Sequence, residues 1–297
     1  MMVQHTVSEH VHMQKKSRVT PGAVVAKVIV YIILIVGAVL MIAPLLWMIA
    51  TALSNDQYAM SFPPKFFPSS FHFGNFLRIF THNDFGLYLR NTLVITIPAI
   101  VGQVLASSLA AFAFARLRAP GKNILFIILL CTLMIPGEVT MIPNFIIFRY
   151  FHWLNTFWPL IVPNFFGNAF NIFLMRQFFM SVPLELDEAA KLDGLGYLGV
   201  WWRIIIPLCK PALVTVAVFT FTANWGNFMG PLIYINNQKL FPLALGIYQM
   251  TQTSNVMEQP NWNLIMAGAL VLTIPMIIVF FYGQRHIYEG SNILGRQ

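Results

Sequence analysis

The sequence predicts an all-α membrane protein with six transmembrane helices and a cytoplasmic helical loop between the fourth and the fifth. Three observations support this fold class. Hydrophobic residues make up 58% of the 297 residues and charged residues only 9%, whereas about a quarter of the residues in soluble domains are charged. The mean hydropathy is +0.70, and apolar runs near the ~20 residues that a bilayer core requires recur along the chain. Basic residues flank these runs without forming a long block, so the net charge of +8 indicates membrane topology and not nucleic-acid binding.

Six apolar runs are expected to cross the bilayer. They lie at about residues 28–53, 91–114, 124–145, 157–179, 211–235 and 264–282. With the N-terminus inside, 13 of the 18 lysines and arginines fall on the cytoplasmic side, and the positive-inside rule requires such an excess. The cytoplasmic residues are Lys15, Lys16, Arg18, Lys27, Arg116, Arg118, Lys122, Arg176, Lys191, Arg203, Lys210, Arg285 and Arg296, and the external ones are Lys65, Arg78, Arg90, Arg149 and Lys239. Both termini are therefore expected in the cytoplasm.

The chain begins with a polar arm, residues 1–23, and a first transmembrane helix, residues 24–53. Three histidines in the arm lack the fixed spacing to further ligands that metal sites show, so no metal site is expected. An external loop is expected at residues 54–88, because its polar residues and the prolines of Pro63-Pro64 and Pro68 would leave unsatisfied backbone groups in lipid.

A core of five transmembrane helices is expected at residues 89–285, followed by a cytoplasmic tail at residues 286–297. Pro136-Gly137 can kink the third span. Glu138, directly after this pair, is the only acidic residue inside a predicted span. Ion-coupled carriers usually place carboxylates within their spans, so this scarcity argues against such a carrier.

The densest run of charge, residues 181–210, connects the fourth and fifth spans. Ser181 and Pro183 are helix start signals, and the acidic residues at 185–188 suit the positive end of a helix dipole. Gly194 can take the left-handed conformation that ends a helix. A second short amphipathic helix is expected after it, because residues at helical spacing are apolar: Tyr197, Val200, Trp201 and Ile204. The pattern therefore predicts a helix, a turn and a second helix.

Polar residues within the spans are candidates for lining a pathway, because lipid-facing positions penalise them. Amides can hydrogen-bond the hydroxyl groups of a solute, and an aromatic ring suits the apolar face of a sugar. The fifth span offers Thr222, Asn224, Trp225 and Asn227, and the fourth span offers Asn164 and Asn168. A hydrogen bond between helices is the alternative role for each of these residues.

Catalytic chemistry is not predicted. A phosphate-binding loop needs Gly-x-x-x-x-Gly-Lys-Ser/Thr after a strand, and the nearest run, Pro120-Gly121-Lys122-Asn123, lacks the first glycine and the hydroxyl. No pairing of a nucleophile with a base stands out, and Cys131 and Cys209 lie on different segments without a ligand spacing. The chain is therefore expected to bind no cofactor and to be a permease, not an enzyme.

Residues 181–210 contain Glu188-Ala189-Ala190, then Asp193-Gly194, and finally Ile204-x-Ile206-Pro207. This arrangement resembles the EAA loop in the permease subunits of ATP-binding-cassette (ABC) importers, where the loop usually ends Leu-Pro. Phe112-Ala113-Phe114-Ala115-Arg116 is similar to the carbohydrate-importer branch, in particular to the maltose-type second permease subunit. Trp225-Gly226-Asn227-Phe228 stands where that branch has Trp-Asn-x-Phe, and Gly226 is a departure that weakens the transfer of a ligand role.

The resemblance implies the fold of a type I ABC importer permease in a bacterial or archaeal cell membrane. In that family the loop is a coupling helix that docks into a cleft on the ATPase. The residues carried over to ATPase coupling are Glu188, Ala189, Ala190, Asp193, Gly194, Ile204 and Pro207. The implied partners are a second, different permease subunit, two ATPase subunits that hold ATP and Mg, and an extracellular or periplasmic sugar-binding protein. We expect an ATP-driven importer of a sugar or oligosaccharide, and an ion-coupled secondary sugar carrier is the alternative.

Overall fold

The computed structural model describes residues 21–55, 68, 70–82, 84–252 and 260–294, which are mostly helical and contain no strand. The polar arm up to residue 20, residues 56–67, 69 and 83 of the external loop, residues 253–259 and the last three residues lie outside the described residues. The chain divides into two compact units, residues 1–47 and 48–297, and each is described by itself.

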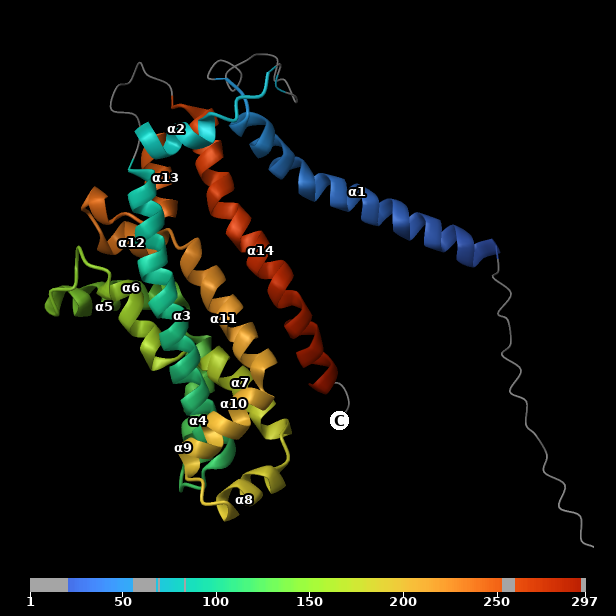
Figure 1. Ribbon diagram of the computed structural model, residues 1–297, viewed down its shortest axis with the longest axis vertical. Helices are drawn as coiled ribbons and strands as arrows, with labels where there is room; N and C mark the ends of the chain where they lie inside the picture. Colours follow the sequence, from blue (N-terminus) through green and yellow to red (C-terminus); the bar gives the residue numbers. More distant parts are fainter. Residues whose placement is uncertain (1–20, 56–67, 69, 83, 253–259, 295–297) are drawn as a thin grey trace, which may run out of the picture. The chain divides into compact units, whose positions relative to one another are not determined.

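Helix α1, Pro21–Ala52, makes up what is described of the first unit and runs on into the second (Figure 1). Its segment Val24–Ala52 is long and apolar enough to cross a bilayer, and none of its most apolar part is buried within the protein. A helix that is apolar on every side suits a lipid environment or burial against another chain. These bounds lie close to the predicted first span at 24–53.

The second unit is built around α3 (Phe85–Arg116), a helix of 32 residues. It packs against α7 (Ala169–Ser181) and α11 (Lys210–Trp225), and α11 also packs against α14 (Trp262–Leu294) (Figure 1). Large apolar side chains fill the space between α3, α7 and α11, among them Phe112, Met175, Phe178, Phe179 and Val216. The second and sixth predicted spans are therefore each a single helix, and both helices extend beyond the predicted bounds.

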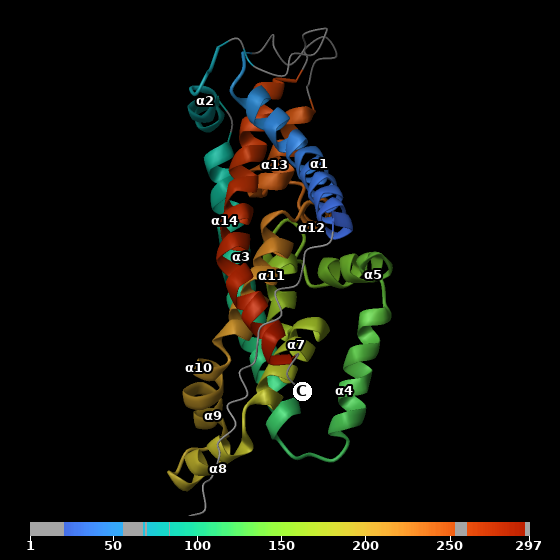
Figure 2. The same cartoon turned by 90° about the vertical axis from the view of Figure 1, so that its right-hand side faces the viewer.

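The third predicted span, 124–145, is not one helix. The chain forms α4 (Lys122–Cys131), a 3-10 turn (Thr132–Met134) and α5 (Gly137–Tyr150), with a bend of 100° at the break. Figure 2 shows α5 turned across the end of α4. Pro136 is in an extended conformation and has no N–H to continue the helix, so the expected kink at Pro136-Gly137 becomes a corner.

The fourth and fifth predicted spans are also interrupted. The fourth consists of α6 (Trp158–Ile161), a 3-10 segment (Val162–Phe166) and α7, with Gly167 at a φ of 77° between the last two. The fifth begins just after an 82° bend that lies between Leu208 and Lys210, and it is interrupted where α11 ends at Trp225. A separate short helix, α12 (Met229–Tyr234), contains the end of the predicted 211–235 span.

By length and composition, three described helices could cross a membrane, or five if each bent pair forms one span. The structure thus supports an all-helical membrane fold, and the six spans predicted from the sequence stay a prediction.

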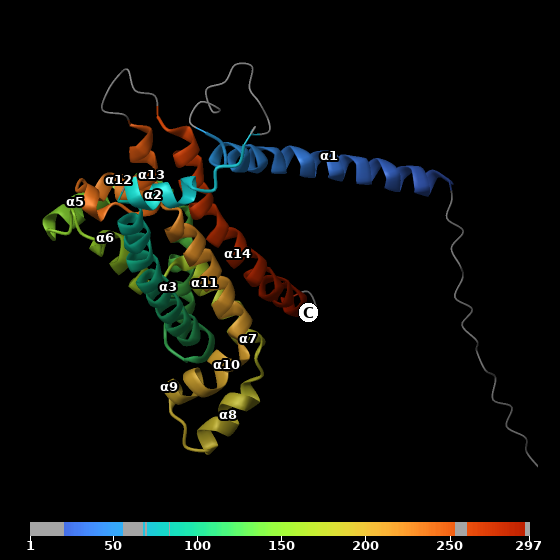
Figure 3. The same cartoon turned by 45° about the horizontal axis from the view of Figure 1, so that its top comes forward.

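Short helices occupy the two ends of the second unit (Figure 3). One end has α2 (Asn75–His82) and α13 (Leu243–Thr251). The other end has α8 (Leu184–Leu192), α9 (Tyr197–Val200), a π-helical turn (Trp201–Ile205) and α10 (Ile206–Leu208). The latter group is the predicted helix–turn–helix loop between the fourth and fifth spans.

The side chain of Asn91 in α3 forms hydrogen bonds with the segment that precedes α13. Its amide nitrogen donates to the carbonyl oxygens of Lys239 at 2.9 Å and Phe241 at 3.0 Å. Asn91→Ala removes both donors, so we expect the free energy of unfolding to fall by about 2 kcal/mol. Thermal unfolding of the detergent-solubilised protein measures this change. The exposed Asn236 provides the control substitution Asn236→Ala, and equal melting temperatures for the two variants would contradict the expected role of Asn91.

Candidate functional site

Helix α8 begins and ends at the residues that the sequence indicates. Pro183 precedes it in an extended conformation. Glu185 and Asp187 lie in its first turn, where their negative charges interact favourably with the positive end of the helix dipole. At its end, Gly194 has a φ of 85°. The N–H of Gly194 donates to the carbonyl of Lys191, and the N–H of Leu195 donates to the carbonyl of Ala190, both at 3.0 Å. These two bonds form a Schellman motif, so the expected left-handed glycine at the end of the helix is confirmed.

One face of α8 is buried and the other is exposed. Ala190 is 5% exposed and belongs to the apolar cluster that joins α3, α7 and α11. The opposite face presents Glu188 and Ala189, and the exposed turn after the helix contains Asp193 and Gly194. The side chain of Leu192 is 90% exposed. The exposed face of α8 therefore presents an acidic residue, small residues and apolar side chains, while its buried face packs against the rest of the protein.

The second helical piece turns three of the four residues expected on its apolar face toward the core: Val200 and Trp201 are buried and Ile204 is half-buried. A π-helical turn covers Trp201–Ile205, and a π turn contains more residues than an α turn. From this turn onward, Ile205 and Cys209 continue the buried face. Tyr197, which was expected on this face, is 53% exposed.

The two coupling candidates at the end of the loop are placed differently. Ile204 is half-buried and packs against the apolar cluster, whereas Pro207 is exposed in α10. Further exposed apolar side chains lie near them: Leu198, Trp202 and Leu208.

A buried ion pair behind α8 was not expected from the sequence. The Nε of Arg116, the last residue of α3, lies 2.9 Å from Oδ2 of Asp187. Their side chains are only 4% and 6% exposed. The Nη2 of Arg116 also donates to the carbonyl oxygen of Val182 at 2.7 Å. In the sequence, Arg116 counts as a cytoplasmic charge and ends the run at residues 112–116 that resembles the carbohydrate-importer branch. An arginine that ends an apolar run is the signal that could have suggested a structural partner.

A second arginine secures the same end of α3. The Nε of Arg176, in α7, donates to the carbonyl oxygen of Phe114 at 3.3 Å. Its Cζ lies 4.2 Å from the centroid of the Phe126 ring in α4. A cation that bonds to a carbonyl in the last turn of a helix complements the negative end of the helix dipole.

The pathway candidates of the fifth span lie at the end of α11 and just after it. The side chains of Thr222 and Asn224 each donate to the carbonyl four residues earlier at 2.9 Å. Trp225 is buried, and its indole N–H donates to the carbonyl of Leu272 in α14 at 2.9 Å. Asn227 accepts a bond from the N–H of Gly230 at 3.1 Å. Trp225 therefore already joins two helices, which is the alternative role considered above.

The candidates of the fourth span flank its break at Gly167. The amide nitrogen of Asn164 donates to the carbonyl of Leu160 at 3.0 Å. The side-chain oxygen of Asn168 accepts from the N–H of Phe170 at 2.9 Å and caps α7. Among the described residues, the amide oxygens of Asn164 and Asn224 accept no hydrogen bond, so both oxygens can accept one from a solute hydroxyl. The ligand role of all six candidates stays a prediction.

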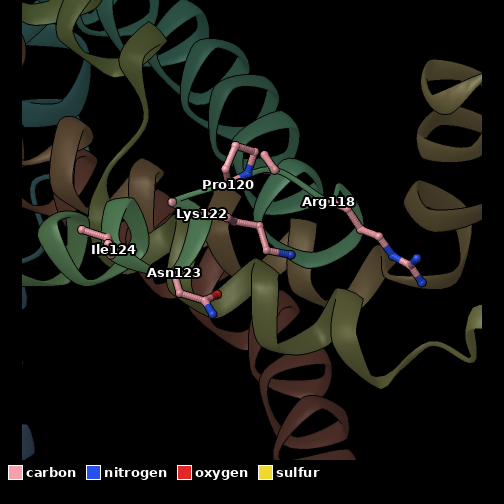
Figure 4. Close-up of a pocket in the computed structure, with 7 residues that line it drawn as sticks. Arg118, Pro120, Lys122, Asn123 and Ile124 are labelled. Atoms are coloured by element: carbon pink, nitrogen blue, oxygen red, sulfur yellow. The ribbon is translucent and has the colours of Figure 1, made fainter.

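A hollow of about 650 Å³ is lined by seven consecutive residues, Arg118–Ile124, in the connection from α3 to α4 (Figure 4). It is the concave side of a turn, and it includes the run that fails as a phosphate-binding loop. The Nζ of Lys122 donates back to the carbonyl of Leu117 at 2.9 Å. Glu138 is exposed in the first turn of α5 and lines a smaller hollow of about 210 Å³ beside α12. No group of three or more histidine, cysteine or acidic side chains in the described parts could hold a metal ion.

Comparisons with known proteins agree on one family. Residues 102–290 match the family described as binding-protein-dependent transport system inner membrane component. The chain is 31% identical over 266 residues to the sn-glycerol-3-phosphate transport system permease protein UgpE of Yersinia pestis, covering 88% of this chain and 94% of that protein. It is 31% identical over 234 residues to the arabinooligosaccharides transport system permease protein AraQ of Halalkalibacterium halodurans, covering 77% and 81%.

A solved structure has the same fold. It belongs to a bacterial ABC transporter involved in the import of the acidic polysaccharide alginate, and the superposition has a TM-score of 0.81 at 23% identity. The match covers 90% of this chain and 98% of the chain in that structure. At this level of identity the likeness establishes the fold.

Proposed function

Because the chain belongs to the family of binding-protein-dependent transport system inner membrane components, we propose that it is the permease subunit of an ATP-driven importer for a sugar or oligosaccharide, and that α8 couples it to the ATPase. The family provides the permease of ABC importers, and ATP is hydrolysed on a separate subunit. The observation that carries the coupling role is α8 itself, a capped helix anchored on one face and exposed on the other.

The chemistry of the substrate follows from two lines of support. The named relatives belong to transport systems for sn-glycerol-3-phosphate and arabinooligosaccharides, and the structural neighbour is involved in the import of alginate, so all three substrates carry two or more hydroxyl groups. In this chain, Asn164 and Asn224 retain acceptor oxygens near the break of the fourth span and the end of α11. Amide acceptors bind neutral hydroxyls without placing a charge in the membrane.

The working unit contains further chains. A second, homologous permease subunit completes the pathway, two ATPase subunits hold ATP and Mg, and a binding protein delivers the substrate from outside. In this arrangement the chain crosses the membrane six times: α1, α3, α4 with α5, α6 with α7, α11 with α12, and α14. Both termini then lie in the cytoplasm, and the excess of basic residues on that side supports this orientation.

The mechanism requires α8 to behave as a rigid element. Glu188 pairs with a basic residue of the ATPase, and Ala189 permits close contact because its side chain is small. Gly194 fixes the turn that redirects the chain toward the second helix. When the ATPase pair closes on ATP, α8 moves with it, and the pathway changes from inward facing to outward facing.

The decisive experiment reconstitutes the permease pair with its ATPase and binding protein in vesicles and follows uptake of a labelled oligosaccharide. Uptake that requires ATP and the binding protein supports the proposal. Uptake driven by an ion gradient without the ATPase would support the secondary carrier instead.

Glu188→Lys tests the site within the same system. A lysine would repel the basic partner residue, so we expect the ATPase to dissociate from the solubilised complex and ATP-driven uptake to fall to background. Co-purification of the ATPase with the permease measures the first effect. Glu185→Gln, an exposed residue in the first turn of the same helix, is the control. Normal assembly and uptake by Glu188→Lys would remove α8 as the docking element.

A further inference from the structure

We propose that Arg116 and Asp187 form a strut that carries the movement of α8 directly into α3. This inference rests on the proposed function, because it assigns the route by which α8 acts on the pathway. The two residues position α8 and contact neither the substrate nor ATP.

Arg116 holds both sides of the corner between α7 and α8. Its Nη2 bonds to the carbonyl of Val182, the residue directly after α7, and its Nε lies against Asp187 in the first turn of α8. A guanidinium is planar and presents its donors in a fixed fork. Two anchors on one rigid group fix the direction of α8 as well as its distance from α3.

The covalent route from α8 toward α11 is poorly suited to transmit the same movement. Toward α11 the chain passes the left-handed Gly194, a π-helical turn and the 82° bend before Lys210. The π-helical turn and the bend are places where backbone angles can change, and the movement of α8 would be absorbed there. By contrast, Arg116 ends an uninterrupted helix of 32 residues.

The position of α3 makes it a suitable receiver. At Gly102 the helix lies directly against the ring of Phe165, since an added Cβ would come within 2.6 Å of that ring. Phe165 belongs to the 3-10 segment that leads to the break at Gly167, and Asn164 and Asn168 flank this break. A displacement of α3 therefore reaches Asn164 and Asn168 through its direct packing on the 3-10 segment.

The pair is poorly arranged to serve stability alone. Nε of Arg116 and Oδ1 of Asp187 are both buried and lack a hydrogen-bond partner among the described residues, so the 2.9 Å approach of the pair is an ionic contact. Removing two charges from water is costly unless all their bonds are satisfied, and buried ion pairs are often replaceable by apolar residues without loss of stability. A pair that is buried and incompletely bonded is better explained by a requirement to hold α8 in a fixed position relative to α3.

The test uses Asp187→Asn, Arg116→Lys and the double variant Arg116→Met/Asp187→Leu in the reconstituted complex. The expected result is that the ATPase still co-purifies, while stimulation of ATP hydrolysis by the substrate-loaded binding protein and ATP-driven uptake both fall about tenfold, a typical coupling factor. A purely structural role would change the amount of complex but not this stimulation. Arg118→Lys, at an exposed arginine whose side chain extends away from Lys122 in Figure 4, is the control.

The outcomes separate this inference from the proposed function. If the variants assemble and are stimulated like the native complex, the strut is wrong, and the proposed function stands as long as Glu188→Lys still fails. If Glu188→Lys also transports normally, the coupling role of α8 itself is wrong.

A second measurement leaves Arg116 and Asp187 intact, so it tests the strut even if none of the variants assembles. Spin labels at position 119, just after α3, and at position 185, in α8, report the distance between the two elements after the native cysteines are replaced. We expect the same distance distribution without nucleotide and with trapped ATP. A shift larger than the width of the distribution would show that α8 moves independently of α3 and would overturn the proposal.

Discussion

Gly194→Pro is expected to abolish ATP-driven uptake while leaving the transmembrane helices folded. Gly194 has a φ of 85°, whereas proline is restricted to a φ near −65°. Proline also lacks the N–H that Gly194 donates to Lys191 at 3.0 Å. The Schellman motif would be lost, and the exposed face of α8 could no longer be presented in one orientation. Uptake into vesicles and co-purification of the ATPase measure the effect.

Two alanine variants show whether the backbone conformation is the cause. Nothing lies within 4 Å of a Cβ added at Gly194, so Gly194→Ala meets no steric clash. Its only cost is the roughly 1–2 kcal/mol of conformational energy that alanine requires in the left-handed region. We expect a partial loss of uptake. Gly196 is also open but has a φ of −74°, so Gly196→Ala should transport normally. Equal activity of all three variants would contradict the role given to this turn.

Gly246→Leu is expected to prevent the protein from folding. Gly246 lies in α13, where an added Cβ would come within 2.6 and 2.7 Å of atoms in the Tyr88 ring of α3. Tyr88 is 7% exposed and its ring also packs beside Phe241, so moving it would disturb the buried contact between α3 and α13. Glycine within a helix costs about 1 kcal/mol relative to alanine, so its presence here indicates that close approach of two helices outweighs helix propensity.

The smaller variant separates packing from propensity. Gly246→Ala should gain about 1 kcal/mol in propensity and lose roughly 1–3 kcal/mol through overpacking, so a lower melting temperature is expected. At Gly86 in α3 the nearest atom to an added Cβ is 3.8 Å away, and Gly86→Ala should therefore melt at or above the native temperature. A stable Gly246→Leu protein would show that α13 does not pack on α3 as described.

The sequence predicted the local features of α8 well, because they depend on neighbouring residues. Pro183, the acidic first turn and Gly194 set the bounds of the helix without help from the rest of the chain. The breaks in the third, fourth and fifth spans were harder to predict. Hydropathy averages over a run, and it cannot distinguish a straight helix from two helices that meet at Pro136 or Gly167.

The ion pair behind α8 could not be predicted from one sequence. Arg116 and Val182 are 66 positions apart, and only the packing of α3 against α7 brings them together. The pathway candidates were chosen for their polarity, and the structure shows that they already bond to the backbone. The amide nitrogens of Asn164 and Asn224 and the indole N–H of Trp225 donate to carbonyls. The amide oxygens of Asn168 and Asn227 accept from backbone N–H groups. Polarity within a span indicates that a partner exists, but it does not show whether the partner is a helix or a solute.

The exposed face of α8 and its neighbours also has a consequence for the supply of subunits. Leu192, Leu198 and Trp202 are 90%, 70% and 60% exposed, and such side chains on a water-facing surface promote aggregation and recognition by quality-control proteases. Under the proposed docking of α8, a copy without an ATPase would therefore be cleared from the cell faster than an assembled one. Matched synthesis of the subunits then becomes a requirement set by this one surface.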